Sequence, residues 1–180
     1  KEANSFEGYT YCSFVIDWKD EAYLNQTKAQ LRQLCNISEY PIIKDFLYDY
    51  YLVKLVDFDT NTFVAYYMGN GNIEINKHYK ASRNLDLYLA HEIAHSATEI
   101  LNLPDWLNEG IAEYCSYRYF GVQFKIEQSI KLENILYWDP SSPQVDARDI
   151  IKGYALSAYI VKKFVDKYGE DKLRELIIAL

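Results

Sequence analysis

Proline, glycine, cysteine and histidine are all scarce in this chain of 180 residues, which contains four Pro, seven Gly, three Cys and three His. With so little Pro and Gly, the chain is neither collagen-like nor of low complexity, and no flexible linker divides it. The longest stretch without a charged residue, 60–73, is shorter than the about 20 apolar residues that a membrane-spanning helix needs. The sequence therefore predicts a single domain over residues 1–180 with no membrane span.

Positive charge is also in short supply, because 19 Lys and Arg face 26 Asp and Glu and leave a net charge of −7. Non-specific affinity for nucleic acid depends on clustered cations, so a nucleic-acid partner is not expected. Hydrophobic residues make up 49% of the chain and charged residues 25%, proportions that favour a folded globular domain over a disordered one. Cys12, Cys35 and Cys115 lack a metal-binding spacing. We expect three buried thiols, with a Cys12–Cys35 bridge and a free Cys115 as the alternative.

Signals for β-structure dominate residues 1–80. The segments rich in Tyr, Val and Ile that predict strands are 9–16, 51–58, 62–68 and 73–76. Gly69-Asn-Gly71 separates the last two and is a strong hairpin signal. Residues 20–34 place leucines on one helical face and predict a helix.

The pattern becomes helical over residues 81–180. The helices predicted here cover 84–101, 105–120, a segment from Asp146 or Asp149 to Tyr168, and the end of the chain from Glu170. Pro104 ends the first of them, and Gly121 follows the second as a C-terminal cap. The order of elements predicts an α+β fold, with a small N-terminal mixed sheet and one or two helices followed by a helical C-terminal half.

The motif His91-Glu-Ile-Ala-His95 lies within the first helix of this half. Residues four apart are neighbours on a helix, so both imidazoles project from one face and can bind a single metal ion. Zinc accepts neutral imidazole nitrogen, and a catalytic zinc site leaves one position for water. Glu92 lies between the two histidines, where its carboxylate can act as a general base without being a ligand.

The next helix offers a third ligand, because Glu109 and Glu113 lie four residues apart on one face. The break at Leu103-Pro104 lets this helix return over the first one, which brings Glu109 to the two histidines. Glu113, one turn further on, can then accept a hydrogen bond from the far nitrogen of a ligating histidine. Such a bond fixes the tautomer of the ring and strengthens the ligand.

His-Glu-x-x-His followed by Leu-Pro-x-Trp-Leu-x-Glu-Gly-x-Ala-x-Tyr resembles the gluzincin metallopeptidases, the thermolysin-like enzymes of the peptidase MA superfamily. The similarity is greatest to their compact bacterial members. Residues 85–118 carry the strong match, and a weaker one covers 153–173. The resemblance implies a zincin-like fold and one zinc ion per chain, held by His91, His95 and Glu109.

The activity that the resemblance implies is zinc-dependent hydrolysis of a peptide or protein substrate. Glu92 is then the general base, and Glu113 supports a ligand from behind. The strand predicted at 73–76 is implied to edge the cleft, where an extended substrate can pair with it. Related aminopeptidases place a tyrosine where this chain has Ile150, so the motif does not supply the donor that stabilises the oxyanion. Tyr154 is the nearest candidate.

Several alternatives stay open on the sequence alone. His78 is a second candidate oxyanion donor, although a plain loop histidine is the commoner role. Glu99 faces the same side as His95 and either rims the cleft or is solvated. A catalytically inactive zincin-fold domain that binds peptides or is purely structural would carry the same motif. Acidity, Lys1 in place of an initiator Met, and the habits of the resembling family favour a secreted or cell-surface bacterial protein; nothing indicates its oligomeric state.

Overall fold

The computed structural model describes residues 4–7, 13–17, 42–48, 50–56, 58, 64–76, 85–123 and 132–180. The described strands all come before the described α-helices along the chain, so the predicted α+β class is confirmed. The strands are β1 (Asn4–Glu7), β2 (Ser13–Asp17), β3 (Tyr50–Val56), β4 (Ala65–Gly69) and β5 (Asn72–Asn76). The helices are the 3₁₀ helices η2 (Lys44–Phe46) and η4 (His95–Ala97) and the α-helices α2 (Leu85–Ala94), α3 (Asp105–Phe120), α4 (Leu132–Ile135), α5 (Ala147–Tyr168) and α6 (Glu170–Ala179).

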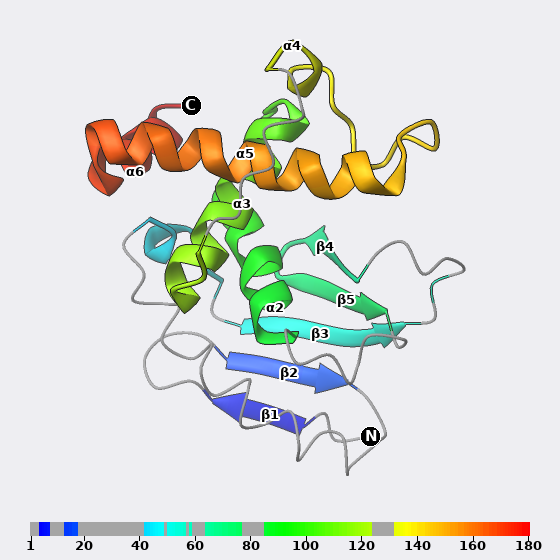
Figure 1. Cartoon of the computed structure of the whole chain (residues 1–180). Coiled ribbons are helices and arrows are strands. Elements are labelled where there is room, and N and C mark those ends of the chain that lie inside the picture. The colour runs from blue at the N-terminus through cyan, green and yellow to red at the C-terminus, as the bar shows by residue number, and fades with distance from the viewer. Residues whose placement is uncertain are drawn as a thin grey trace.

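The strands form one mixed sheet in the order β1-β2-β3-β5-β4. α2 lies against this sheet, α3 packs on α2, and α5 packs on α3 (Figure 1). β1 is antiparallel to β2, β2 and β5 are both parallel to β3, and β4 is antiparallel to β5. The prediction that 73–76 forms the edge strand is therefore wrong. These residues lie in β5, and the parallel pairing of β5 with β3 leaves β4 at the edge of the described sheet.

β4 and β5 form the hairpin that the sequence predicts at residues 69–71. Gly69, Asn70 and Gly71 have φ angles of 87°, 51° and 75°, in the left-handed region that glycine and asparagine tolerate best. A register shift between Tyr67 and Gly69 adds a bulge at the turn end of β4. Along β4, Tyr66 and Met68 are exposed, whereas Tyr67 is partly buried and faces the helices that follow.

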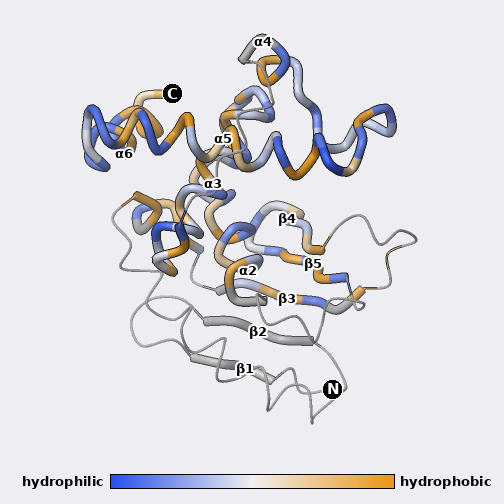
Figure 2. Tube along the Cα trace, in the orientation of Figure 1, coloured by the Kyte–Doolittle hydropathy of each residue, from blue (hydrophilic) through white to orange (hydrophobic). Residues whose placement is uncertain are grey.

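The core lies between this sheet and α2. Side chains on one face of the sheet alternate with those on the other. The fully buried side chains that the sheet contributes to this core are Tyr51, Val53, Ile73 and Ile75. Those of α2 that join the same cluster are Leu89, Ala90, Ile93 and Ala94. Figure 2 shows hydrophobic residues gathered where α2 faces the sheet, whereas hydrophobic and hydrophilic residues alternate along α5.

Two glycines allow the remaining helices to pack closely. α3 lies between α2 and α5. A Cβ on Gly110 of α3 would lie 2.8 Å from the backbone oxygen of Ser157 in α5, so the two backbones approach more closely than any side chain would allow. At Gly153 a Cβ would lie 2.0 Å from the indole ring of Trp138. The indole ring of Trp138 therefore occupies the space that a side chain at position 153 would need.

The boundaries of the long helices agree with the sequence signals. α3 begins directly after Pro104 and ends at Gly121, whose φ of 66° is that of a left-handed C-terminal cap. Asp146 is the N-cap of α5, because its carboxylate accepts a hydrogen bond from the N–H of Arg148 at 2.7 Å. None of the helices in the described part of the chain is long and apolar enough to span a membrane.

The helix predicted over 84–101 is shorter than expected. α2 ends at Ala94, and η4 carries His95 in a tighter turn. The N–H of Thr98 donates to the carbonyl of His95 at 3.0 Å, and such local bonds compete with the α-helical pattern. β1, η2 and α4 were not predicted from the sequence. Cys115 is a buried free thiol in α3, whereas the predictions for 20–34, Cys12, Cys35 and His78 fall outside the described residues.

Candidate metal centre

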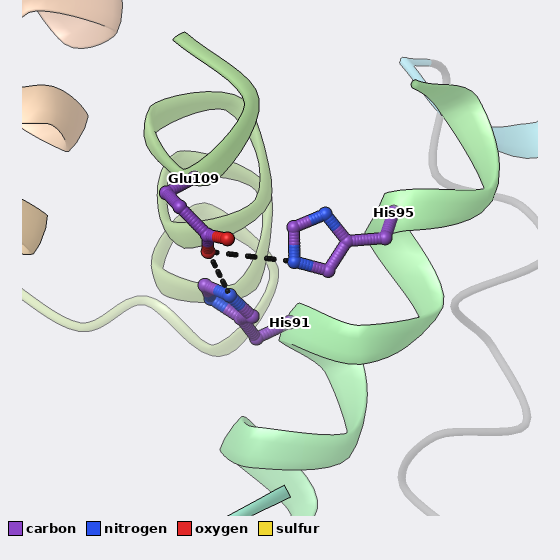
Figure 3. A group of neighbouring side chains, drawn as sticks. All are labelled: His91, His95 and Glu109. Carbon is purple, nitrogen blue, oxygen red and sulfur yellow. Dashed lines mark hydrogen bonds and ion pairs between the residues drawn. The ribbon is translucent and has the colours of Figure 1, made fainter. Parts of the chain in front are cut away.

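Side chains from α2, η4 and α3 converge on one point (Figure 3). Nε2 of His91 lies 3.0 Å from Oε2 of Glu109, and Nε2 of His95 lies 3.4 Å from the same oxygen. One ligand atom from each of the three residues lies within 4.8 Å of the others. The fold thus brings together the three residues that the sequence put forward as metal ligands, because α3 returns over α2 after the break at Pro104.

This donor set fits zinc in type and spacing. Ligand atoms around a tetrahedral zinc ion with bonds of about 2.0–2.1 Å lie roughly 3.3–3.4 Å apart. The two nitrogen-to-oxygen distances to Glu109, 3.0 and 3.4 Å, are close to that separation. His91 and His95 are only 8% and 9% exposed, so the site excludes most of the water that would compete for the ion.

The far side of each imidazole is held by a residue of α3. Nδ1 of His91 lies 2.8 Å from Oε2 of Glu113, and Nδ1 of His95 lies 3.3 Å from Oδ1 of Asn108. Each Nδ1 can donate its proton to these acceptors on α3, and Nε2 is then the nitrogen of each ring that faces Glu109 and could bind a metal. Sequence reasoning named Glu113 and missed Asn108. The only sequence signal for Asn108 was an amide side chain directly before Glu109 on the same helix.

The charges of the cluster favour a cation at its centre. Burial opposes ionisation of Glu109, but hydrogen bonds from His91 and His95 outweigh it and hold the pKa of this carboxyl far below its usual range. Burial also disfavours a charged His91, yet hydrogen bonds to Glu109 and Glu113 raise the pKa of its imidazole well above 6.5. Two carboxylates close to one buried ring are the surroundings in which a positive charge is most stable.

Glu92 lies beside the ligand cluster without belonging to it. Its side chain is 8% exposed and lines the same cleft as the histidines. Burial raises the pKa of this carboxyl, and the neighbouring imidazoles of His91 and His95 partly offset that effect. Glu92 is therefore a buried carboxyl at the wall of the cleft, next to the three candidate ligands and separate from them.

The cleft over the cluster has a volume of about 430 Å³ and is lined by residues of β4, α2, η4, α3 and α5. Tyr154 of α5 lines it, with its ring 5.9 Å from that of His91 and 5.1 Å from that of Trp138, centroid to centroid. Burial raises the pKa of the Tyr154 hydroxyl, and the charges of Glu109 and Glu92 raise it further. The hydroxyl thus stays protonated and able to donate.

Six residues that the sequence put forward, His91, Glu92, His95, Glu109, Glu113 and Tyr154, all lie at this site. Glu99 also lines the cleft. This is one of the two positions that the sequence left open for it, the other being a solvated surface position. The arrangement combines three side chains that could hold a cation, a buried carboxyl and a phenol hydroxyl, groups whose chemistry is compatible with hydrolysis of a polarised carbonyl. Comparison of the chain with models of protein families, with curated proteins and with solved structures finds no match in any of the three.

Proposed function

We propose that this protein is a zinc-dependent peptidase of the gluzincin type, with a zincin-like fold, that hydrolyses peptide bonds. One observation carries the proposal: Oε2 of Glu109 lies within 3.4 Å of Nε2 of both His91 and His95, while Glu92 is buried beside them and outside the ligand set. A structural domain has no need to bury a spare carboxylate next to three potential ligands. A hydrolase needs that carboxylate as a base.

The ion itself would be held by His91, His95 and Glu109. When bound, zinc supplies a Lewis acid that polarises the scissile carbonyl and lowers the pKa of water toward about 7. Glu92 accepts the proton of the attacking water and then passes it to the leaving amine. Its burial suits this exchange, because a raised pKa makes the carboxylate a better proton acceptor.

The hydroxyl of Tyr154 is the donor proposed for the developing oxyanion. It lines the cleft, and its ring packs against those of His91 and Trp138. A donor that is already in place when the charge develops stabilises the transition state more than the substrate.

β4 takes the substrate-binding role that the sequence assigned to 73–76. All of its residues, Ala65–Gly69, line the cleft, and β4 is one of the two edge strands of the described sheet. An extended peptide can add to such an edge as a further strand. Binding would then rest on main-chain hydrogen bonds and place few demands on the side chains of the substrate.

Two measurements test the proposal. Zinc content is measured after metal loading for the parent chain and for His91→Ala, with circular dichroism to show that the variant is folded. We expect one zinc per chain in the parent and little in the variant. Turnover is measured on a mixture of unfolded polypeptides, and Glu92→Gln should retain zinc but lose activity by about 10²–10⁴-fold.

The outcomes separate the proposal from its rivals. Equal zinc content in the parent and in a folded His91→Ala variant would rule out the proposed metal centre. Zinc binding without turnover in the parent would favour the catalytically inactive peptide-binding alternative. Equal activity in the parent and in Glu92→Gln would show that the base is another residue.

A further inference from the structure

The carboxylate of Glu99 accepts three hydrogen bonds from three separate parts of the chain. The hydroxyls of Tyr48 and Tyr67 lie 2.7 and 2.8 Å from its Oε2, and the N–H of Asn70 lies 2.6 Å from its Oε1. Tyr48 follows η2, Tyr67 belongs to β4, and Asn70 is in the β4–β5 turn. Glu99 itself follows η4, directly after the segment that carries His95. One side chain therefore ties the edge hairpin to the metal-binding segment.

The hairpin is shaped to receive this carboxylate. A Cβ on Gly69 would lie 3.1 Å from Oε1 of Glu99, so the turn backbone comes into close contact with the acid. The N–H of Gly71 donates to the hydroxyl of Tyr67 at 3.2 Å, and that hydroxyl donates in turn to Glu99. Burial opposes ionisation, but the three hydrogen bonds lower the pKa of Glu99. A solvated surface carboxylate would make these bonds to water instead.

Tyr67 connects this cluster to the proposed active site. Its ring stacks on the imidazole of His95, with centroids 6.2 Å apart and planes 27° apart. Tyr67 also lines the same cleft as Glu92. The hydroxyl that Glu99 holds therefore belongs to a residue that stacks on a proposed metal ligand and lines the cleft together with the proposed base.

We propose that Glu99 is a positioning residue. It holds β4 where the ring of Tyr67 stacks on His95 and where β4 forms the wall of the cleft, and it contacts no reacting group itself. The catalytic consequence rests on the proposed peptidase function. The tether between Glu99 and the hairpin is independent of that function. The tether and its catalytic consequence can therefore be tested separately.

Three variants and a control in the zinc-loaded protein test the tether. Glu99→Ala removes all three bonds, and Glu99→Gln keeps one carbonyl oxygen as an acceptor. Tyr48→Phe removes one donor from outside the residues that line the cleft. Ile100→Ala is the matched control, because this neighbouring side chain is 93% exposed.

Amide hydrogen exchange gives the readout that does not depend on activity. In Glu99→Ala we expect the β4 amides to exchange at least about tenfold faster, while those of α5 keep the parent rate. Glu99→Gln and Tyr48→Phe should lie between Glu99→Ala and the parent, and Ile100→Ala should match the parent. Unchanged exchange in β4, or equal acceleration in β4 and α5, would overturn the tether.

Kinetics on an extended peptide then tests the positioning role. We expect kcat/KM of Glu99→Ala to fall at least about tenfold at unchanged zinc content, with partial rescue in Glu99→Gln. Parent values of kcat and KM in a variant whose β4 exchanges faster would overturn this role. If the parent shows no turnover, the proposed function fails, and the affinity for the peptide replaces kinetics. Weaker binding by Glu99→Ala then supports positioning of β4, and equal binding overturns it.

Discussion

Nδ1 of His91 lies 2.8 Å from Oε2 of Glu113, one helical turn beyond Glu109 on α3. The same helix thus supplies a candidate ligand to one nitrogen of the ring and an acceptor to the other. Because the two contacts come from one rigid element, the orientation of His91 is fixed before any ion binds. Preorganisation of this kind raises metal affinity by reducing what must be ordered on binding.

We therefore expect Glu113→Ala to weaken zinc affinity by about 10–100-fold without unfolding the protein. Glu113→Gln should lose less zinc affinity than Glu113→Ala, because its amide oxygen can still accept a hydrogen bond from Nδ1 of His91. Competition with a chromophoric chelator measures both affinities. Glu175→Ala, which removes an exposed acid from α6, is the control and should keep the parent affinity. Equal zinc affinity in Glu113→Ala and the control would contradict this role.

Zinc should stabilise the folded protein, because its ligands meet only when α3 lies over α2. A ligand that binds the folded state alone at 100 times its Kd stabilises it by about 2.7 kcal/mol. We expect Tm to rise when zinc is added to the metal-free protein and to fall again with a chelator. Glu109→Gln, which replaces a ligand with a poorer one, should show a much smaller rise. A Tm that does not respond to zinc would argue against the site.

The hydrogen bonds to Glu99 should give stability a specific pH dependence. Burial raises the pKa of this carboxyl, but bonds from Asn70, Tyr48 and Tyr67 outweigh it, so the folded pKa lies below the unfolded value of about 4.3. Their contribution is then fully present above the unfolded pKa and is lost as pH falls through the folded one. The difference in unfolding free energy between the parent and Glu99→Gln should stay constant from about pH 6 to 8 and shrink in acid. Urea unfolding measures it, and a difference that grows in acid would contradict the assignment.

Close packing at Gly110 should be needed for stability and for metal binding. Gly110→Ala puts a methyl group 2.8 Å from the backbone oxygen of Ser157, which we expect to cost about 1–3 kcal/mol. Because Gly110 follows Glu109, the shift of α3 should also weaken zinc affinity. Gly121→Ala is the comparison: its methyl group meets open space, so only its left-handed backbone is strained, at about 1 kcal/mol, and zinc affinity should not change. Equal zinc affinity in the two variants would contradict the coupling.

The parts of the fold that local chemistry determines could be predicted from the sequence. Pro104 and Gly121 mark the ends of α3, Asp146 caps α5, and the turn at 69–71 needs residues that tolerate positive φ. The convergence of His91, His95 and Glu109 also follows from local rules, because it requires only two helical faces and a tight turn between them.

The order of strands could not be predicted in the same way. The sequence put residues 73–76 at the edge, yet β5, which contains them, pairs in parallel with β3, and β4 lies at the edge. The order of strands depends on contacts between residues far apart in the sequence, such as those between the sheet and α2, and no local pattern reveals them. Asn108 and Glu99 were underestimated for a related reason. Their partners lie on other elements, so no spacing along the chain reveals them.

Tyr154 provides the sharpest test of the chemistry, since Tyr154→Phe removes one hydroxyl and leaves the ring contacts with His91 and Trp138. If that hydroxyl donates to the oxyanion, its contribution exists mainly in the transition state. We expect kcat to fall by about 10²–10³-fold with little change in KM, the usual effect of losing one such donor. Zinc content and Tm should stay at parent values, because the side chain keeps its packing. An unchanged kcat would remove Tyr154 from the mechanism and direct the search for the donor elsewhere in the cleft.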